Sequence, residues 1–336
     1  MFVDTDNKRA IRERWNLPFL RMAQARLERP LAYLGLPGAY LNDLIDWNEV
    51  LGIKTCVQIV RKPKEQREED LEIVSQMLHN ILVKDIRDTQ VIRSSIEDLL
   101  ITGQGTDGAS PTLARKDSSS GWCFEYDLFN LDFLGGVNYK AKRKAADSHG
   151  QKSPRVRAIE QLFIRQRGQS FTLLLTVNVR DTFGDEPAQF LIEHAKRTEN
   201  ALLAQVAQWG ATLEEGMKQH QLRLWIPLWI RELAEMQNFR CRCLPSVAYV
   251  GHEKAKMMHF AFEFEFLDGR DLRVNSDQSL EGVLKLPMLS VVDGAFFYCV
   301  SPGSPCTINE PAHGPLTAGT LAELIQDTSQ VSTGAH

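Results

Sequence analysis

Short apolar runs alternate along the chain with stretches of helical periodicity, starting at residue 31. Five runs have the length and the β-branched or aromatic content of buried strands, and they lie at 31–36, 55–60, 90–93, 126–133 and 171–179. The stretches that follow them place apolar residues every three or four positions, as in helices that pack on one side. This alternation predicts an α/β fold in which helices cover a mostly parallel sheet.

The helices of this pattern are expected at 40–51, 68–78, 155–167, 186–209 and 222–236. Pro227 falls inside the last of them, where it predicts either a kink or a helix start.

Two long β-prone runs come after the helices, at 239–250 and 257–267, with Gly251–Lys254 between them. The second run places a phenylalanine at every other position from 260 to 266, so one face of that strand belongs to the core. These runs predict an antiparallel hairpin formed by the last two strands.

The two ends of the chain have a different character from the middle. Residues 1–30 have a helical pattern rich in Lys and Arg, either a solvated helix or a docking surface for phosphate or an acidic partner. Residues 102–121 are rich in Gly, Ser and Thr and predict a surface loop. We expect a basic helical extension at 1–30, an α/β domain at 31–268, and an irregular extension at 269–336 that ends in a disordered tail.

Composition narrows the class of protein. The 336 residues are 43% hydrophobic and 24% charged, which is typical of a globular protein. With 39 Lys and Arg against 43 Asp and Glu, the net charge is −4, so a nucleic-acid partner needs a local basic surface. No apolar window reaches the length of a membrane span, and the N-terminus is polar, so we expect a cytoplasmic protein with no membrane partner. Its cysteines are expected to be reduced.

A local basic surface is predicted between residues 140 and 167. This stretch has nine basic residues against Asp147 and Glu160. The candidate nucleic-acid-binding residues are Lys140, Lys142, Arg143, Lys144, Lys152 and Arg155. Binding through such residues is salt-sensitive, because it releases counterions from the phosphates.

The most specific motif is YDLFNLDFLGG at residues 126–136. It resembles the strand-four motif of nucleic-acid N-methyltransferases, and most of all its form in tRNA guanine-N2 dimethyltransferases and three-Cys-motif partner proteins. The resemblance implies the class I S-adenosylmethionine-dependent methyltransferase fold, a three-layer Rossmann-like sandwich with a seven-stranded, mostly parallel sheet that ends in an antiparallel hairpin. It also implies that Asp132 and Asn130 position an amino nitrogen for methyl transfer.

Other segments are similar to this family in part. The resemblance implies that S-adenosylmethionine is bound by Gly35 and Gly38 after the first strand and by Ser95 after the third. Arg61 stands at the cofactor position after the second strand and is a further candidate, where a cation favours a phosphate-bearing ligand over a neutral ribose. No metal is expected, because Cys241 and Cys243 lack the CxxC spacing of zinc sites.

Three departures from the family pattern keep a second function open. The glycine loop has two glycines in an altered arrangement, Arg61 and Lys62 stand where an acidic residue is expected, and Phe133-Leu134 replaces Pro-Pro. One hypothesis is a divergent methyltransferase that binds or modifies nucleic acid at an amino nitrogen. The alternative is a catalytically inactive subunit that serves as a binding or assembly module in a protein or nucleoprotein complex. An open, cofactor-sized pocket beside Gly35–Gly38 and Asp132 favours the enzyme, and a pocket filled by Arg61, Tyr33 or Phe133 favours the subunit.

Overall fold

The computed structural model describes residues 4–58, 68–106, 108–117, 121–133, 135–137, 152–166, 168–179, 185–198, 215–268, 282–283, 285–300 and 314–326. The strands are β1 (Leu31–Gly35), β2 (Leu51–Gln58), β3 (Thr89–Arg93), β4 (Ala114–Asp117), β5 (Gly121–Phe124), β6 (Leu128–Asp132), β7 (Phe171–Asn178), β8 (Phe239–Cys243), β9 (Ser246–Val250), β10 (Lys256–Phe266), β11 (Met288–Val292) and β12 (Ala295–Val300). The helices are α1 (Asp6–Ala10), the π-helix η1 (Ile11–Asn16), α2 (Leu17–Leu27), α3 (Asn42–Asp46), α4 (Glu68–Val83), α5 (Ile96–Thr102), α6 (Pro154–Arg165), α8 (Asp185–Thr198), α10 (Glu215–Glu235), the 3-10 turn η3 (His252–Lys254) and α12 (Ala318–Gln326).

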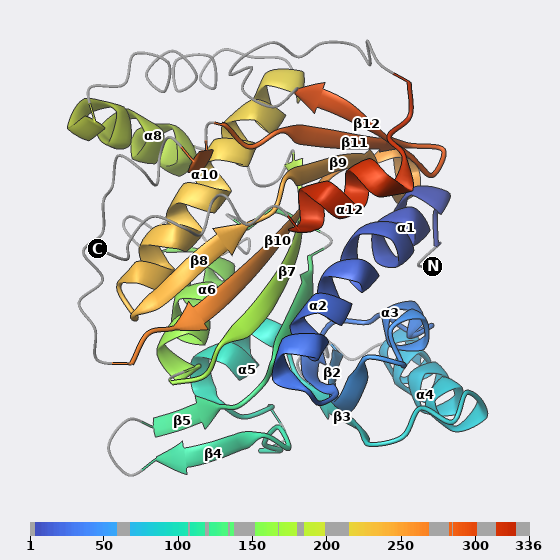
Figure 1. The fold of residues 1–336 in the computed structure, drawn as a ribbon. Helices are drawn as coiled ribbons and strands as arrows, with labels where there is room; N and C mark the ends of the chain where they lie inside the picture. Colours follow the sequence, from blue (N-terminus) through green and yellow to red (C-terminus); the bar gives the residue numbers. More distant parts are fainter. Residues whose placement is uncertain are drawn as a thin grey trace.

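A ten-stranded sheet forms the centre of the molecule, in the order β12-β11-β9-β10-β7-β6-β1-β2-β3, with β8 also beside β10 (Figure 1). Strands β3, β2, β1, β6 and β7 are parallel neighbours. The chain adds β2 and β3 on one side of β1 and β6 and β7 on the other, so the sheet is doubly wound. Strand β10 is antiparallel to β7. The predicted Rossmann-like α/β fold, mostly parallel with an antiparallel end, is confirmed.

The sheet is larger than the expected seven strands for two reasons. The predicted strand at 239–250 divides into β8 and β9, which pair with different halves of β10. Pro245 lies at the division, and proline has no N–H to continue the ladder. The second reason is the pair β11–β12, where we expected irregular chain. Its turn, Asp293-Gly294, has φ angles of 48° and 75°, which suit a tight two-residue hairpin.

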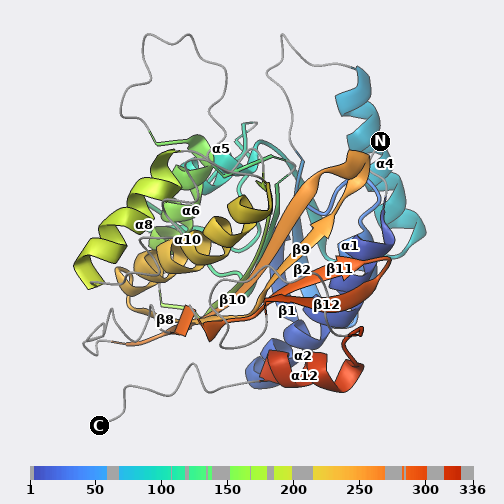
Figure 2. The ribbon, with the colours of Figure 1, turned by 90° about the horizontal axis from the view of Figure 1, so that it is seen from above.

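Helices cover both faces of the sheet (Figure 2). On one face α5, α6, α8 and α10 pack over a core that includes the aromatic rings of Phe163, Phe171 and Phe264. The alternating phenylalanines of β10 point into this core, as predicted. On the other face lie α1, η1, α2, α3, α4 and α12. No described helix is long and apolar enough to cross a membrane.

The N-terminal helices are packed against the sheet and are not a solvated extension. Trp15, Phe19 and Leu20 are fully buried, and Trp15 stacks on Phe296 of β12. Near the C-terminus, α12 packs on the same helices through Leu321 and Ile325. The three-part domain division stays a prediction.

Two further segments differ from their predicted form. The helix expected at 40–51 is limited to α3, because Leu41 has a φ of 56° and the chain turns again after Asp46. The loop expected at 102–121 contains β4 and ends where its antiparallel partner β5 begins. The helix expected at 186–209 begins as α8, and its part beyond residue 198 lies outside the described residues. Pro227 lies within α10, which runs on both sides of it.

Candidate functional site

A cleft of about 180 Å³ lies at the carboxyl ends of β1, β2 and β6. This is the switch point of the sheet, where open α/β folds bind their ligands. The loop after β1, the end of β2, the end of β6 and the N-terminal helices all contribute to its wall. The lining residues are Asp4, Lys8, Arg12, Leu36, Pro37, Gly38, Ala39, Tyr40, Asn42, Asp43, Val57, Gln58, Asp132, Phe133 and Arg155. The volume is below the roughly 300 Å³ at the lower end of ligand pockets, so a nucleoside-sized ligand requires lining side chains to move.

The two glycines predicted to bind the cofactor differ in their surroundings. A Cβ atom on Gly35 would lie 2.5 Å from the Tyr33 hydroxyl oxygen and 2.6 Å from the carbonyl oxygen of Asn130. Packing inside the sheet therefore requires Gly35. Gly38 has a φ of 69°, lines the cleft, and has no atom within 4 Å of the position that a Cβ would take. Of the two, only Gly38 leaves room for a ligand.

The two candidate catalytic residues occupy different positions. Asp132 lines the cleft, and its Oδ2 atom accepts a hydrogen bond from Lys8 Nζ at 2.7 Å. Asn130 is only 4% exposed and donates from Nδ2 to Asp43 Oδ2 at 2.7 Å. Asn130 therefore holds Asp43 and lies beneath the cleft.

Of the two remaining predicted cofactor residues, only Ser95 is described, and it is not brought to the cleft. Ser95 is the N-cap of α5, where its hydroxyl accepts from the backbone N–H of Asp98 at 3.0 Å, and it does not line the cavity. Arg61 lies outside the described residues.

Two of the six predicted nucleic-acid-binding residues are described. Lys152 forms an ion pair with Glu160 at 2.6 Å. Arg155 lies at the cleft wall, donates to Glu97 and to the carbonyl of Gly136, and stacks over the Phe133 ring. The other four lie outside the described residues, and they are Lys140, Lys142, Arg143 and Lys144.

The basic residues of the N-terminal helices also have partners within the chain. Arg14 donates to the carbonyl of Gly294, and the others face carboxylates. The ion pairs are Lys8–Asp132, Arg9–Asp4, Arg12–Asp4, Arg21–Glu49, Arg26–Glu263 and Arg29–Asp127. These contacts favour a role for the basic N-terminal residues within the fold over a docking surface for phosphate or an acidic partner, because groups of the same chain already compensate their charges.

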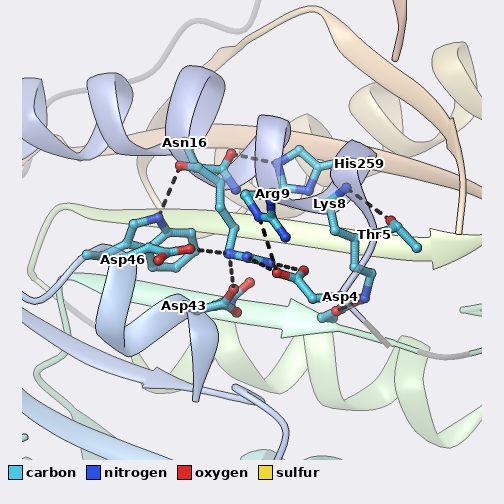
Figure 3. A network of polar contacts seen from close by, with 12 residues as sticks. Asp4, Thr5, Lys8, Arg9, Asn16, Asp43, Asp46 and His259 are labelled. Carbon is cyan, nitrogen blue, oxygen red and sulfur yellow. Dashed lines mark hydrogen bonds and ion pairs between the residues drawn. The ribbon is translucent and has the colours of Figure 1, made fainter. Parts of the chain in front are cut away.

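Arg12 is the centre of the polar network at the cleft wall. Figure 3 shows its carboxylate partners Asp4, Asp43 and Asp46. Its terminal nitrogens donate to the two carboxylate oxygens of Asp4 at 2.8 and 2.7 Å, and Nε donates to Asp46 at 2.6 Å. The same Nε lies 3.6 Å from an oxygen of Asp43. Burial disfavours the charged guanidinium, but the hydrogen bonds and charges of these carboxylates outweigh burial and raise the pKa of Arg12.

Asp43 is a residue of the site that the sequence did not indicate. Burial raises the pKa of its carboxyl group from 3.8 to about 6, against the opposing charge of Arg12. It lines the cleft and also a smaller cavity below it. A carboxyl group with such a pKa can hold or release a proton near neutral pH. The segment around Asp43 has the pattern of an ordinary helix start, and only the fold brings Arg12 and Asn130 to it.

The smaller cavity has a volume of about 30 Å³, enough for one or two water molecules. Its polar wall includes Asp43, Asn130, Asp132, Thr176 and His259. The Oδ1 atom of Asp132 is buried and has no hydrogen-bond partner among the described residues. Asp132 lines both cavities, so its side chain lies where the cleft and this smaller cavity, which we call the chamber, adjoin.

His259 is fixed as a neutral ring in the wall of the chamber. Its Nε2 lies 2.8 Å from Asn16 Oδ1, and its Nδ1 lies 2.9 Å from the hydroxyl of Thr176. Because an amide oxygen can only accept, this arrangement assigns the proton to Nε2, and Nδ1 accepts from Thr176. Burial lowers the pKa of His259 from 6.5 to about 4.

Asp43 and His259 are expected to make the stability of the folded protein depend on pH in opposite directions. The raised pKa of Asp43 favours its protonated form in the folded state, so its contribution to stability is lost as pH rises from 3.8 through about 6. The lowered pKa of His259 favours its neutral form, so its contribution is lost as pH falls from 6.5 through about 4. Each effect is on the order of 3 kcal/mol, and the two offset each other.

Single variants should separate these two effects in thermal melts between pH 4 and 7. In Asp43→Asn the histidine effect remains, so stability should rise with pH more steeply than in the wild type. In His259→Gln the aspartate effect remains, and stability should fall with rising pH. A pH profile of Asp43→Asn parallel to that of the wild type would contradict the assignment.

Comparisons with known proteins add little to this picture. No model of a known protein family matches the chain, and no curated protein matches it. Among solved structures, the chain is similar to precorrin-6y C5,15-methyltransferase from Geobacter metallireducens GS-15, with 8% sequence identity over 73% of this chain and 87% of that one. The TM-score is 0.33. At this level the similarity says nothing about the reaction, and the Rossmann-like fold is assigned from the strand order and directions of the sheet itself.

Proposed function

We propose that the protein is a divergent S-adenosylmethionine-dependent methyltransferase that acts on an amino nitrogen, with nucleic acid as the acceptor. The observation that carries the proposal is the cleft at the switch point, where the turn at Gly38 and the carboxylate of Asp132 meet. Asp132 of the strand-four motif lines this cleft, and the carboxyl ends of the strands are where an open α/β sheet offers a ligand site.

The cleft offers groups that suit the cofactor. The turn at Gly38 leaves space for close approach of a ligand to the backbone. Gln58 lies at the end of β2 and lines the cleft. Its amide can both donate to and accept from hydroxyl groups, and it would hold the ribose there. When bound, S-adenosylmethionine supplies an electrophilic methyl group.

Asp132 would orient the acceptor amine. A carboxylate that accepts a hydrogen bond from the amine N–H fixes the direction of the nitrogen lone pair, and fixed orientation is a large part of the rate of such a reaction. Its Oδ1 atom is buried without a hydrogen-bond partner among the described residues, so the carboxylate has an unused acceptor that a rearrangement of the site would expose. The nucleic-acid acceptor is supported by the basic stretch 140–167, which has nine basic residues against Asp147 and Glu160.

Calorimetric titration with S-adenosylmethionine tests the proposal. We expect saturable heat from the wild type and a raised melting temperature, because a ligand at a hundredfold excess over its Kd stabilises the folded state by about 2.7 kcal/mol. Gly38→Ala should weaken binding at least tenfold, since the added methyl group enters the cleft.

Gly108→Ala is the matched control for this variant. Gly108 has a φ of 81°, has open space around the Cβ position as Gly38 does, and does not line the cleft. The two substitutions therefore impose a similar backbone strain, and only one of them should affect binding. Absence of both heat and thermal protection in the wild type would overturn the proposal.

The alternative function is a catalytically inactive binding or assembly module. It is favoured by the ion pair of Lys8 with Asp132 and by the small volume of the cleft, both of which reduce the space for a cofactor. Under this alternative the titration gives no heat, and Asp132→Ala changes only stability.

A further inference from the structure

In the contact between Lys8 and Asp132 a nitrogen donates a hydrogen bond to the same carboxylate that an acceptor amine would use. A primary ammonium group lies 2.7 Å from one oxygen of the carboxylate. This ion pair lies where the two cavities adjoin, since Lys8 and Asp132 both line the cleft and the chamber. The free chain therefore already has a nitrogen at the position expected for the acceptor amine.

We propose that Lys8 is an internal competitor: its ammonium group occupies the amine-binding position on Asp132, and it must swing away before an external amine can bind there. That an acceptor amine uses this position rests on the proposed function. That the position binds a primary ammonium group rests on the contact itself.

The rest of the site agrees with a binding position that is only partly satisfied. Lys8 contacts Oδ2 of Asp132, while Oδ1 of the same carboxylate is buried without a partner among the described residues. An ammonium group that is not tethered to α1 is free of the single direction of approach that the lysine stem imposes. The adjoining chamber of about 30 Å³, which Lys8 and Asp132 both line, has polar groups in its wall beside this position.

Lys8 can leave Asp132 toward solvent. The two side chains are each 24% exposed, so water can take over part of the hydrogen bonding of both charged groups when they separate. The lysine side chain is a flexible four-carbon stem, so the ammonium group can leave Asp132 without movement of the helix. Arg12 differs from Lys8, because three carboxylates surround the Arg12 side chain and keep η1 in place.

Butylammonium is a suitable probe, because it reproduces the lysine side chain without the backbone. We expect it to raise the melting temperature of Lys8→Ala with an apparent Kd at least tenfold lower than its Kd for the wild type, where the tethered ammonium competes at a high effective concentration. Butan-1-ol has the same carbon chain without the charge and should have no comparable effect. Lys8→Ser is a second variant with the same expectation.

Two further variants make the test specific. Lys8→Met keeps most of the side-chain volume without the charge and should block the probe. Lys8→Ala combined with Asp132→Asn removes the carboxylate and should abolish the response. Equal stabilisation of the wild type and both truncated variants, or an unchanged response in the double variant, would overturn the proposal. Since no S-adenosylmethionine is added, this result is independent of the cofactor titration.

Discussion

Replacement of Arg12 by methionine should lower the free energy of unfolding by about 3–5 kcal/mol. The guanidinium is the shared partner of Asp4, Asp43 and Asp46, and its side chain is only 9% exposed. Methionine fills most of the same space, so the loss comes from carboxylates left without their cation rather than from a cavity. Urea denaturation, read as the change in midpoint at constant slope, measures the effect.

Arg9→Ala is the matched control, because Arg9 lies one helical turn before Arg12. Its side chain is 52% exposed, and its nearest carboxylate oxygens, on Asp4 and Asp6, are 3.8 and 3.5 Å away. Such a pair contributes about 0.5 kcal/mol or less. Equal destabilisation by the two substitutions would show that the network around Arg12 does not anchor the N-terminal helices.

The Arg12→Met variant should also recover part of its stability as the pH falls toward 4, because the orphaned carboxylates become protonated. Combination with Asp43→Asn should cost less than the sum of the single changes, since the two residues share one network. Strict additivity of the two substitutions would argue that Asp43 is stabilised by other groups.

Gly35→Ala is expected to have the second largest effect, a loss of about 3 kcal/mol or more. The new methyl group would lie 2.6 Å from the carbonyl oxygen of Asn130, a backbone atom of the neighbouring strand β6. Strands β1 and β6 pair at this position, so the clash can be relieved only by separating them at the centre of the sheet. The change in denaturation midpoint and the yield of folded protein are the measurements.

Gly38→Ala separates this steric effect from backbone strain. Gly38 has a positive φ but open space around it, so alanine there should cost only about 1 kcal/mol. Adding Tyr33→Phe to Gly35→Ala removes the nearest side-chain atom and should recover only a minor part of the loss, because the contact with Asn130 remains. Full recovery in that double variant would assign the effect to the tyrosine.

The sequence pattern was sufficient for the central part of the fold. Strands β1, β2, β6 and β7 are apolar runs that are mostly buried in the sheet, and continuous burial makes such runs easy to recognise in a sequence. Strand β3 lies at the edge of the sheet, and only Ile92 in it is buried, so its β-prone residues are the signal that predicts it. The sequence pattern does not predict the hairpin β11–β12, although Asp293-Gly294 is a typical hairpin turn. The apolar runs beside the turn are short, and a Pro-rich segment follows them. The stability of the hairpin comes from pairing with β9, a contact that no local pattern records.

The candidate site is only partly predictable, because most of its contacts join segments that are far apart in the sequence. Asp132 could be found, because a motif and a strand end coincide there. Asp43, Arg12 and His259 could not, because they come from separate elements and acquire their properties from one another. A basic helical segment also has the same sequence signature whether its charges face solvent or the carboxylates of its own sheet, which is why the pairing of Lys8 and Arg12 was not foreseen.

The packing of α12 has a consequence for the order in which the protein can be completed during synthesis. The residues that supply Lys8 and Arg12 leave the ribosome well before Phe296, Leu321 and Ile325, which belong to the surface that covers their helices. A nascent chain that ends before β11 therefore has its parallel strands but lacks the cover that secures η1 and α2. The helices that supply Lys8 and Arg12 to the cleft are covered on their outer side only when translation has passed residue 326.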